Sequence, residues 1–291
     1  MKYTPKTRAQ LQALCNDVNI KLDEIDVSKF TNFSFLFSNS CRTNKQFEGI
    51  EKWNVSNGRN FAGMFCNAKN FNRDISKWDV SNGERFYRMF ENATKFNQPI
   101  GDWKVGKCSE FISMFNGAKS FNQDISKWDV SKSTNFICMF SGAKSFNQPV
   151  GDWNVSKSLS LQSMFENAEA FNQDISKWNV SKTTSFDSMF KGAKSFNQDI
   201  SKWNVSNGEF FNQMFSQALS FNQDISSWNT SKGVNFFAMF SGAKSFNQEI
   251  SGWLLERALD NFIFDDEFFH LKNTTKKKKF LLDFLLFWKK N

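Results

Sequence analysis

Residues 121–145 read FNQDISKWDVSKSTNFICMFSGAKS, and closely similar 25-residue segments precede and follow them. The clearest marker is tryptophan, which returns every 25 residues: Trp53, Trp78, Trp103, Trp128, Trp153, Trp178, Trp203, Trp228 and Trp253. Met-Phe and Phe-Asn pairs keep the same spacing. A fixed period of about 20 to 50 residues indicates a repeat protein whose units stack and bury one continuous core.

The apolar spacing changes inside each unit. Trp128 and Val130 lie two residues apart, as on one side of a strand. The apolar residues that follow have the i, i+3, i+4, i+7 spacing of a helical stripe: Phe136, Met139, Phe140 and Ala143. The sequence therefore predicts an α/β repeat solenoid, a leucine-rich-repeat-like right-handed coil with one short strand and one short helix per 25 residues.

The ends of the chain differ from its middle. Residues 1–24 are expected to form an N-terminal helical cap, residues 25–45 an atypical first coil, and residues 46–253 the regular repeats. Residues 254–291 are a degenerate last coil and a basic, apolar C-terminal tail that ends in FLLDFLLFWKKN. This terminal segment is too short to cross a membrane. We expect the tail to be a closing cap, an interfacial helix or a segment read out of frame.

Several regular ladders are expected to be structural. Most units carry Asp-x-Ser before the Trp, whereas residues 99–101 and 149–151 read Pro-x-Gly; both sequences form turns, so the Asp is a turn former rather than a metal ligand. The Asn of each Phe-Asn pair is expected to bind backbone groups of the adjacent coil. Opposite charges are expected to face one another along one ladder: Lys77, Asp102, Lys127, Asp152 and Lys177.

Composition and motifs argue against several classes of function. The net charge is +8, but much of the excess lies in the last twenty residues, and the repeats mix Lys with Asp and Asn instead of carrying a Lys/Arg stripe, so no nucleic-acid partner is expected. Five cysteines without a CxxC pair favour neither a disulfide framework nor a zinc site. The N-terminus lacks the apolar run of a signal peptide, and no segment has the roughly 20 apolar residues of a membrane span.

An enzyme is not expected either. The recurring GAKS lacks the order of a phosphate-binding loop, and His270 is the only histidine. Acidic residues repeat identically from unit to unit, whereas a catalytic centre needs a unique environment. We therefore expect no catalytic residues, no metal and no cofactor.

The best candidate for a binding site is the outward side of the predicted strands, beside the buried Trp and Val positions. Its residues are regularly spaced and polar: Asp79, Lys104, Asp129, Asn154, Asn179, Asn204 and Asn229, with Ser131, Ser156 and Ser181 next to them. This uniform surface would suit a periodic polymer. A protein partner would favour positions that vary, such as one register on the predicted helical side: Tyr87, Ile112, Ile137, Gln162, Asp187, Asn212 and Phe237.

The FNQDISxWDVS…MFxxA unit resembles that of the BspA-like leucine-rich-repeat surface proteins of bacteria, over about residues 25–260. The family pattern has a branched apolar residue and then Met after Trp-Asp-Val-Ser, whereas this chain has a small residue and then mostly Phe. A small residue beside a large one indicates a repacked core of similar volume. The resemblance implies adhesion or binding of a protein or extracellular matrix or glycan partner. It also implies a cell-surface or secreted location, with a cytoplasmic one left open.

The function expected from sequence is therefore that of a non-enzymatic binding or adhesion module. The alternatives are a structural, self-assembling element and a binder of a repetitive polysaccharide. Membrane contact is expected only through the C-terminal tail, where four consecutive lysines precede an apolar segment.

Overall fold

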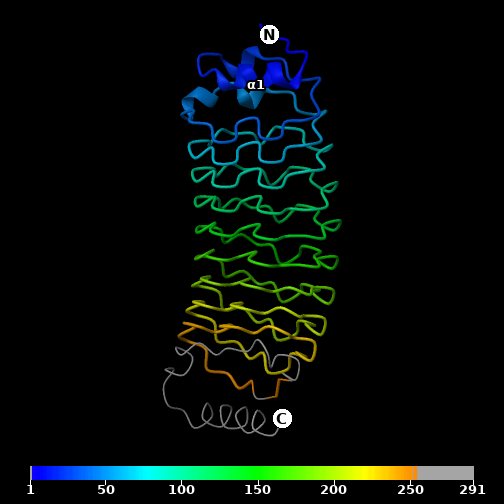
Figure 1. Ribbon diagram of the computed structural model, residues 1–291, viewed down its shortest axis with the longest axis vertical. Helices are drawn as coiled ribbons and strands as arrows, with labels where there is room; N and C mark the ends of the chain where they lie inside the picture. Colours follow the sequence, from blue (N-terminus) through cyan, green and yellow to red (C-terminus); the bar gives the residue numbers. More distant parts are fainter. Residues whose placement is uncertain (1, 251, 254–291) are drawn as a thin grey trace.

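The computed structural model describes residues 2–250 and 252–253, so the expectations for residues 254–291 lie outside the described residues. In Figure 1 the 25-residue coils follow one another along the long axis in the order of the sequence. The helix α1 (Arg8–Asn16) lies at the N-terminal end, within the predicted cap. It begins with a capping box, in which the Thr7 side chain accepts from the Gln10 backbone N–H and the Gln10 side chain accepts from that of Thr7.

Three single-turn 3₁₀ helices connect the cap to the regular coils: η1 (Leu22–Glu24), η2 (Lys45–Phe47) and η3 (Ile50–Lys52). The buried Arg42 ties this region together, because its guanidinium donates to the backbone oxygens of Cys15, Asp17 and Gln46. No helix among the described residues is long and apolar enough to cross a membrane.

The segment predicted to be helical is a series of tight turns. In the coil at 111–118, Ser113 N–H donates to the Ile137 oxygen of the next coil at 2.9 Å, and Phe115 N–H donates to Met139 at 2.9 Å. The intervening Met114 N–H instead closes a turn onto Phe111 at 3.2 Å. Thus every second backbone N–H in this segment fastens the coil to its successor.

The predicted strand and helix in each repeat are therefore wrong, and with them the leucine-rich-repeat-like α/β solenoid. The described repeats contain no α-helix, and their backbone pairing consists of isolated parallel bridges such as Asn135 with Ser160 and Ser160 with Ser185. An α-helix bonds its N–H groups to its own carbonyls and would leave none for the neighbouring coil. Left-handed residues reverse the backbone at regular places instead, with φ of 53° at Ser113 and 68° at Gly117.

The predicted core is nevertheless correct. Trp128 and Val130 are 3% and 1% exposed, and the Met and Phe positions of each coil are buried with them. Phe140 stacks between Phe115 and Phe165, with ring centroids 5.7 and 5.6 Å away. Equivalent Phe residues form continuous aromatic columns through the stack.

Polar ladders fasten the coils as the sequence predicted. The Asn97 side-chain oxygen accepts from the Asn122 backbone N–H at 2.9 Å and from the Gln123 amide at 3.0 Å. Each Trp indole of the described coils also donates to the preceding coil, as Trp128 does to the Ile100 oxygen at 3.0 Å. These bonds satisfy buried polar groups that would otherwise destabilise the stack.

Candidate functional site

We define the polar row as the exposed residues between the buried Trp and Val positions: Asp79, Lys104, Asp129, Asn154, Asn179, Asn204 and Asn229. The regular stacking brings them into one line along the molecule. They do not lie on a strand, however. In most coils the side chain forms a local turn, as when Asp129 Oδ1 accepts from Ser131 N–H at 3.0 Å and Asn154 Oδ1 accepts from Ser156 N–H at 3.1 Å.

These turns bear directly on the predicted site residues. Ser131, Ser156 and Ser181 follow the polar row and are half-buried. Hydrogen bonds from Ser131 lower the pKa of Asp129, with a further contribution from the positive charges of Lys132 and Lys157. Most residues of the polar row therefore have a structural task in the coil, although their remaining polar atoms face outward.

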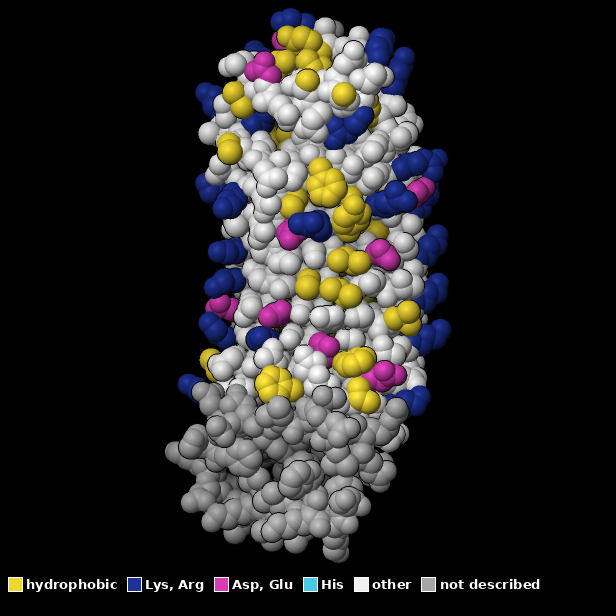
Figure 2. All heavy atoms as spheres, viewed as in Figure 1, with side chains coloured by type: hydrophobic (Ala, Val, Ile, Leu, Met, Phe, Trp, Pro, Cys, Tyr) yellow, Lys and Arg dark blue, Asp and Glu magenta, His cyan; other side chains and the backbone are white. Residues whose placement is uncertain are grey.

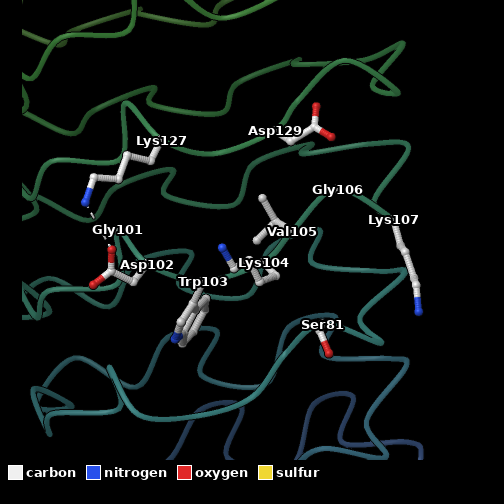
Figure 3. A pocket seen from close by; sticks show the side chains of 10 residues that line it. All are labelled: Ser81, Gly101, Asp102, Trp103, Lys104, Val105, Gly106, Lys107, Lys127 and Asp129. Carbon is white, nitrogen blue, oxygen red and sulfur yellow. Dashed lines mark hydrogen bonds and ion pairs between the residues drawn. The ribbon is translucent and has the colours of Figure 1, made fainter.

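A pocket interrupts the polar row at Lys104 (Figure 3). Here Lys104 and Gly106 replace the residue pair that forms the turn in other coils, and the space of about 360 Å³ is bordered by Asp102, Lys107 and other side chains. A Cβ at Gly106 would lie 2.8 Å from Asp129 Oδ2, so a larger residue here would require the Asp129 side chain to move. The pocket is mixed in charge and open to solvent.

The lysines around this pocket differ in their partners. Lys127 pairs with Asp102 at 3.3 Å across neighbouring coils, as the charge ladder predicted. Lys107 donates to the neutral Asn82 oxygen at 2.7 Å. The pocket thus offers cations that could attract an anionic group, but it has no arrangement of acid, base and nucleophile.

A second candidate surface lies on the outward positions of the tight-turn segment of each coil, where the sequence varies from coil to coil. We call it the turn face and define it by four registers of each coil, which in one coil are Leu159, Ser160, Gln162 and Glu166. Three of its residues, each at a different register, are large, hydrophobic and exposed: Leu159 at 55%, Phe210 at 38% and Phe237 at 38%. Figure 2 shows hydrophobic side chains separated by acidic and neutral ones along one face of the molecule.

The turn face also carries an unusual carboxylate. Burial raises the pKa of Asp187 to about 6, although the Asn212 backbone N–H donates to its carboxylate at 3.1 Å. The Asn212 side-chain amide lies beside the same carboxylate. Nearby, Lys191 donates to the Gln213 side chain at 2.7 Å, so polar groups on this face are connected between coils.

Two of the buried cysteines, Cys15 and Cys108, are poorly suited to act as nucleophiles. Burial raises the pKa of Cys15 to about 12 and that of Cys108 to about 11, which opposes formation of the nucleophilic thiolate. In the part of the chain that the structure describes, no group of three or more His, Cys, Asp or Glu side chains could hold a metal ion.

Sequence reasoning missed one feature of the surface. Lysines occupy the same register in four successive coils: Lys107, Lys132, Lys157 and Lys182. The signal was present in the 25-residue spacing, but the total charge and the local mixture of Lys with Asp concealed it.

Comparison with known proteins identifies a family for these repeats. The family described as "Mycoplasma protein of unknown function, DUF285" matches three overlapping parts of the chain, residues 8–118, 106–193 and 175–274. No curated protein and no solved structure matches the sequence.

Proposed function

The chain belongs to the family described as "Mycoplasma protein of unknown function, DUF285", and we propose that it is a non-enzymatic binding module that contacts a protein partner through its turn face. The exposure of Leu159, Phe210 and Phe237 carries this proposal. Apolar side chains that project among polar ones are typical anchors of protein interfaces.

The distribution of sequence variation supports the same surface. The Trp, Phe and Asn ladders are almost identical from coil to coil because each copy repeats the same contact with its neighbour. The register of Tyr87 and Ile112 instead changes to Gln162 and Asp187 in later coils. A surface with a different side chain in each coil can complement an irregular protein partner.

Adhesion at a cell surface is the setting that we propose, on the basis of the resemblance to BspA-like surface proteins. The alternative is self-assembly, in which the exposed side chains of the turn face contact another copy of the chain. The polar row is a second candidate surface, favoured by the lysines and the pocket beside it.

Substitutions taken from other coils test the turn face without introducing a foreign residue. The triple variant Leu159→Thr, Phe210→Ser and Phe237→Gln uses side chains already present at the same registers, namely Thr184, Ser185 and Gln162. The control variant Lys119→Thr and Lys202→Ser follows the same principle, with Thr94 and Ser227 as its models. Both variants should unfold at denaturant concentrations close to that of the unmodified protein.

Immobilised protein would be incubated with solubilised cell-surface proteins, and the retained proteins quantified by mass spectrometry. We expect at least one protein to be retained equally by the unmodified chain and the control, and about tenfold less by the triple variant, since apolar anchors carry much of an interface's binding energy. Equal retention by all three forms would contradict the proposal. Concentration-dependent association of the unmodified chain alone, lost in the triple variant, would instead establish self-assembly.

A further inference from the structure

Four lysines form a straight line beside the polar row. Lys107, Lys132, Lys157 and Lys182, which we call the lysine row, are exposed and lie two residues after the buried Val of four successive coils. Neighbouring hydrogen-bonded backbones are about 4.8 Å apart, so the row extends over roughly 14 Å. Figure 2 shows Lys and Arg side chains in lines along both edges of the molecule.

None of these four lysines has an ion-pair partner among the described residues, and they stand next to one another in successive coils. Elsewhere, Lys177 pairs with Asp152 at 3.0 Å, and Glu169 binds both Lys144 and Lys194. The neutral residues Asn82 and Asn207 occupy the same register on the two sides of the row.

This arrangement is unfavourable without a partner. Like charges that face one another across adjacent backbones repel. Asp129 is the one carboxylate of the polar row beside these four coils, and the following coils carry the neutral Asn154 and Asn179 there. Lys107 lies near carboxylates, because it lines a pocket with Glu84 and Glu110 and its charge acts on Asp79. The strip is therefore net positive around Lys132, Lys157 and Lys182, where a linear anion would neutralise it.

Hydrogen-bonding groups lie in register with the cations. The side-chain oxygens of Asn154 and Asn179 are used by the local turns, at 3.1 Å from the backbone nitrogens of Ser156 and Ser181. Their amide N–H groups point away from this bond and can donate to an external hydroxyl or carboxylate. Each of these coils thus offers one cation and one amide donor at the same interval.

The aromatic residues indicate which kind of anion fits. Proteins that bind single-stranded nucleic acids stack bases on exposed aromatic rings. The rings beside the lysine row, Trp153 and Trp178, are only 4% and 3% exposed and cannot act as such platforms. We infer that the lysine row, with Asn154 and Asn179, binds a linear acidic polysaccharide, whose carboxylate or sulfate groups pair with the lysines and whose hydroxyls accept from the amides.

This inference is independent of the protein partner proposed for the turn face. The full-length chain would be titrated with a polygalacturonate oligosaccharide and, separately, with a heparin oligosaccharide, with neutral dextran as the uncharged control. We expect both acidic ligands to bind, dextran not to bind, and affinity to fall steeply as the salt concentration rises, because ion pairs at an exposed surface are screened.

Two variants based on other coils locate the site. Lys132→Asn with Lys157→Asn should weaken binding by about tenfold, since two of the four cations are lost. Asn154→Asp with Asn179→Asp should weaken it by a similar factor, about tenfold, because carboxylates replace amide donors while the turn acceptor remains. Asp79 and Asp129 show that the coil accommodates Asp at this register.

The control variant Lys119→Thr with Lys202→Ser removes the same number of charges elsewhere and should change affinity by less than about twofold. The turn-face triple variant should bind the polysaccharide normally. The inference would be overturned if neither acidic ligand bound, or if the lysine-row variant and the control variant weakened binding equally. So would tighter binding of single-stranded DNA or of phosphatidylserine vesicles than of either oligosaccharide.

Discussion

The hydrogen bond from each Trp indole to the preceding coil can be tested with Trp128→Phe. Trp128 is almost fully buried, and its Nε1 donates to the Ile100 oxygen at 3.0 Å. The ring also packs against Phe111 and Phe115 of the preceding coil, with centroids 5.9 and 6.1 Å away. Phenylalanine preserves an aromatic ring at this place but removes the donor and leaves the Ile100 carbonyl without it.

The expected loss of stability has two parts. A buried carbonyl without its donor destabilises a protein by about 1–3 kcal/mol. The smaller ring leaves a cavity that adds about 1 kcal/mol. We therefore expect Trp128→Phe to lower the free energy of unfolding by about 2–4 kcal/mol.

Urea unfolding followed by circular dichroism would measure this change. Phe140→Leu is a suitable control, because it reduces a buried ring of the same coil without removing a hydrogen bond. Trp103→Phe should resemble Trp128→Phe, since its indole donates to the Ile75 oxygen at 3.2 Å. A loss for Trp128→Phe no larger than that of the control would refute the idea that the indole bonds fasten the coils.

Three further predictions concern the backbone, a carboxylate and the cap. Gly101→Ala should lower the melting temperature more than Gly142→Ala. The new Cβ at residue 101 would lie 2.2 Å from the backbone oxygen of Asp124. At Gly142 the only penalty is the left-handed backbone, with a φ of 67°, which costs an alanine about 1–2 kcal/mol. Asp187→Asn should stabilise the protein by about 1–2 kcal/mol at pH 7 and by nothing below about pH 4. The pKa of Asp187 is about 6 in the folded chain, above the unfolded value of 3.8. The stability of the unmodified chain therefore falls as the pH rises between those two values. Denaturant unfolding at several pH values would reveal it, and a pH-independent difference would contradict it. Arg42→Met should lower the protection of α1 against hydrogen exchange by roughly a hundredfold, or about 3 kcal/mol, because the backbone oxygens of Cys15 and Asp17 lose the guanidinium donor. Unchanged protection would show that Arg42 does not hold the cap.

The sequence predicted burial better than conformation. The 25-residue period identified Trp128, Val130, Phe136 and Phe140 as core residues because apolar spacing reports directly which side chains face inward. It did not distinguish a helix from consecutive three-residue turns, which also bring residues three apart to the same side. The recurring Gly or Asn at the register of Asn92 and Gly117 was the available warning, since both residue types tolerate a left-handed backbone.

Prediction of the candidate site was limited in a similar way. The alternation of buried Trp and Val predicted that Asp129 and its equivalents are exposed, and they are. The hydrogen bond from Ser131 N–H to Asp129 depends on a turn that the strand prediction did not contain. The 25-residue spacing of the lysine row was visible in the sequence, but its lack of ion pairs was not, because partners in adjacent coils, such as Asp152 for Lys177, are identified only in the structure.

Hydrogen bonding between coils restricts where a binding function can lie. In the coil at 111–118, the peptide groups that donate to the next coil also carry the oxygens that accept from the previous one, as with the Ile112 oxygen and the Ser113 N–H. Every coil must therefore present the same backbone geometry to both neighbours, which fixes its turn-forming and buried side chains. Side chains whose atoms take no part in these bonds can change without disturbing the stack, and Leu159 and Lys157 are two such residues. The turn face and the lysine row, the two surfaces proposed to bind partners, are therefore places where specificity could arise without loss of stability.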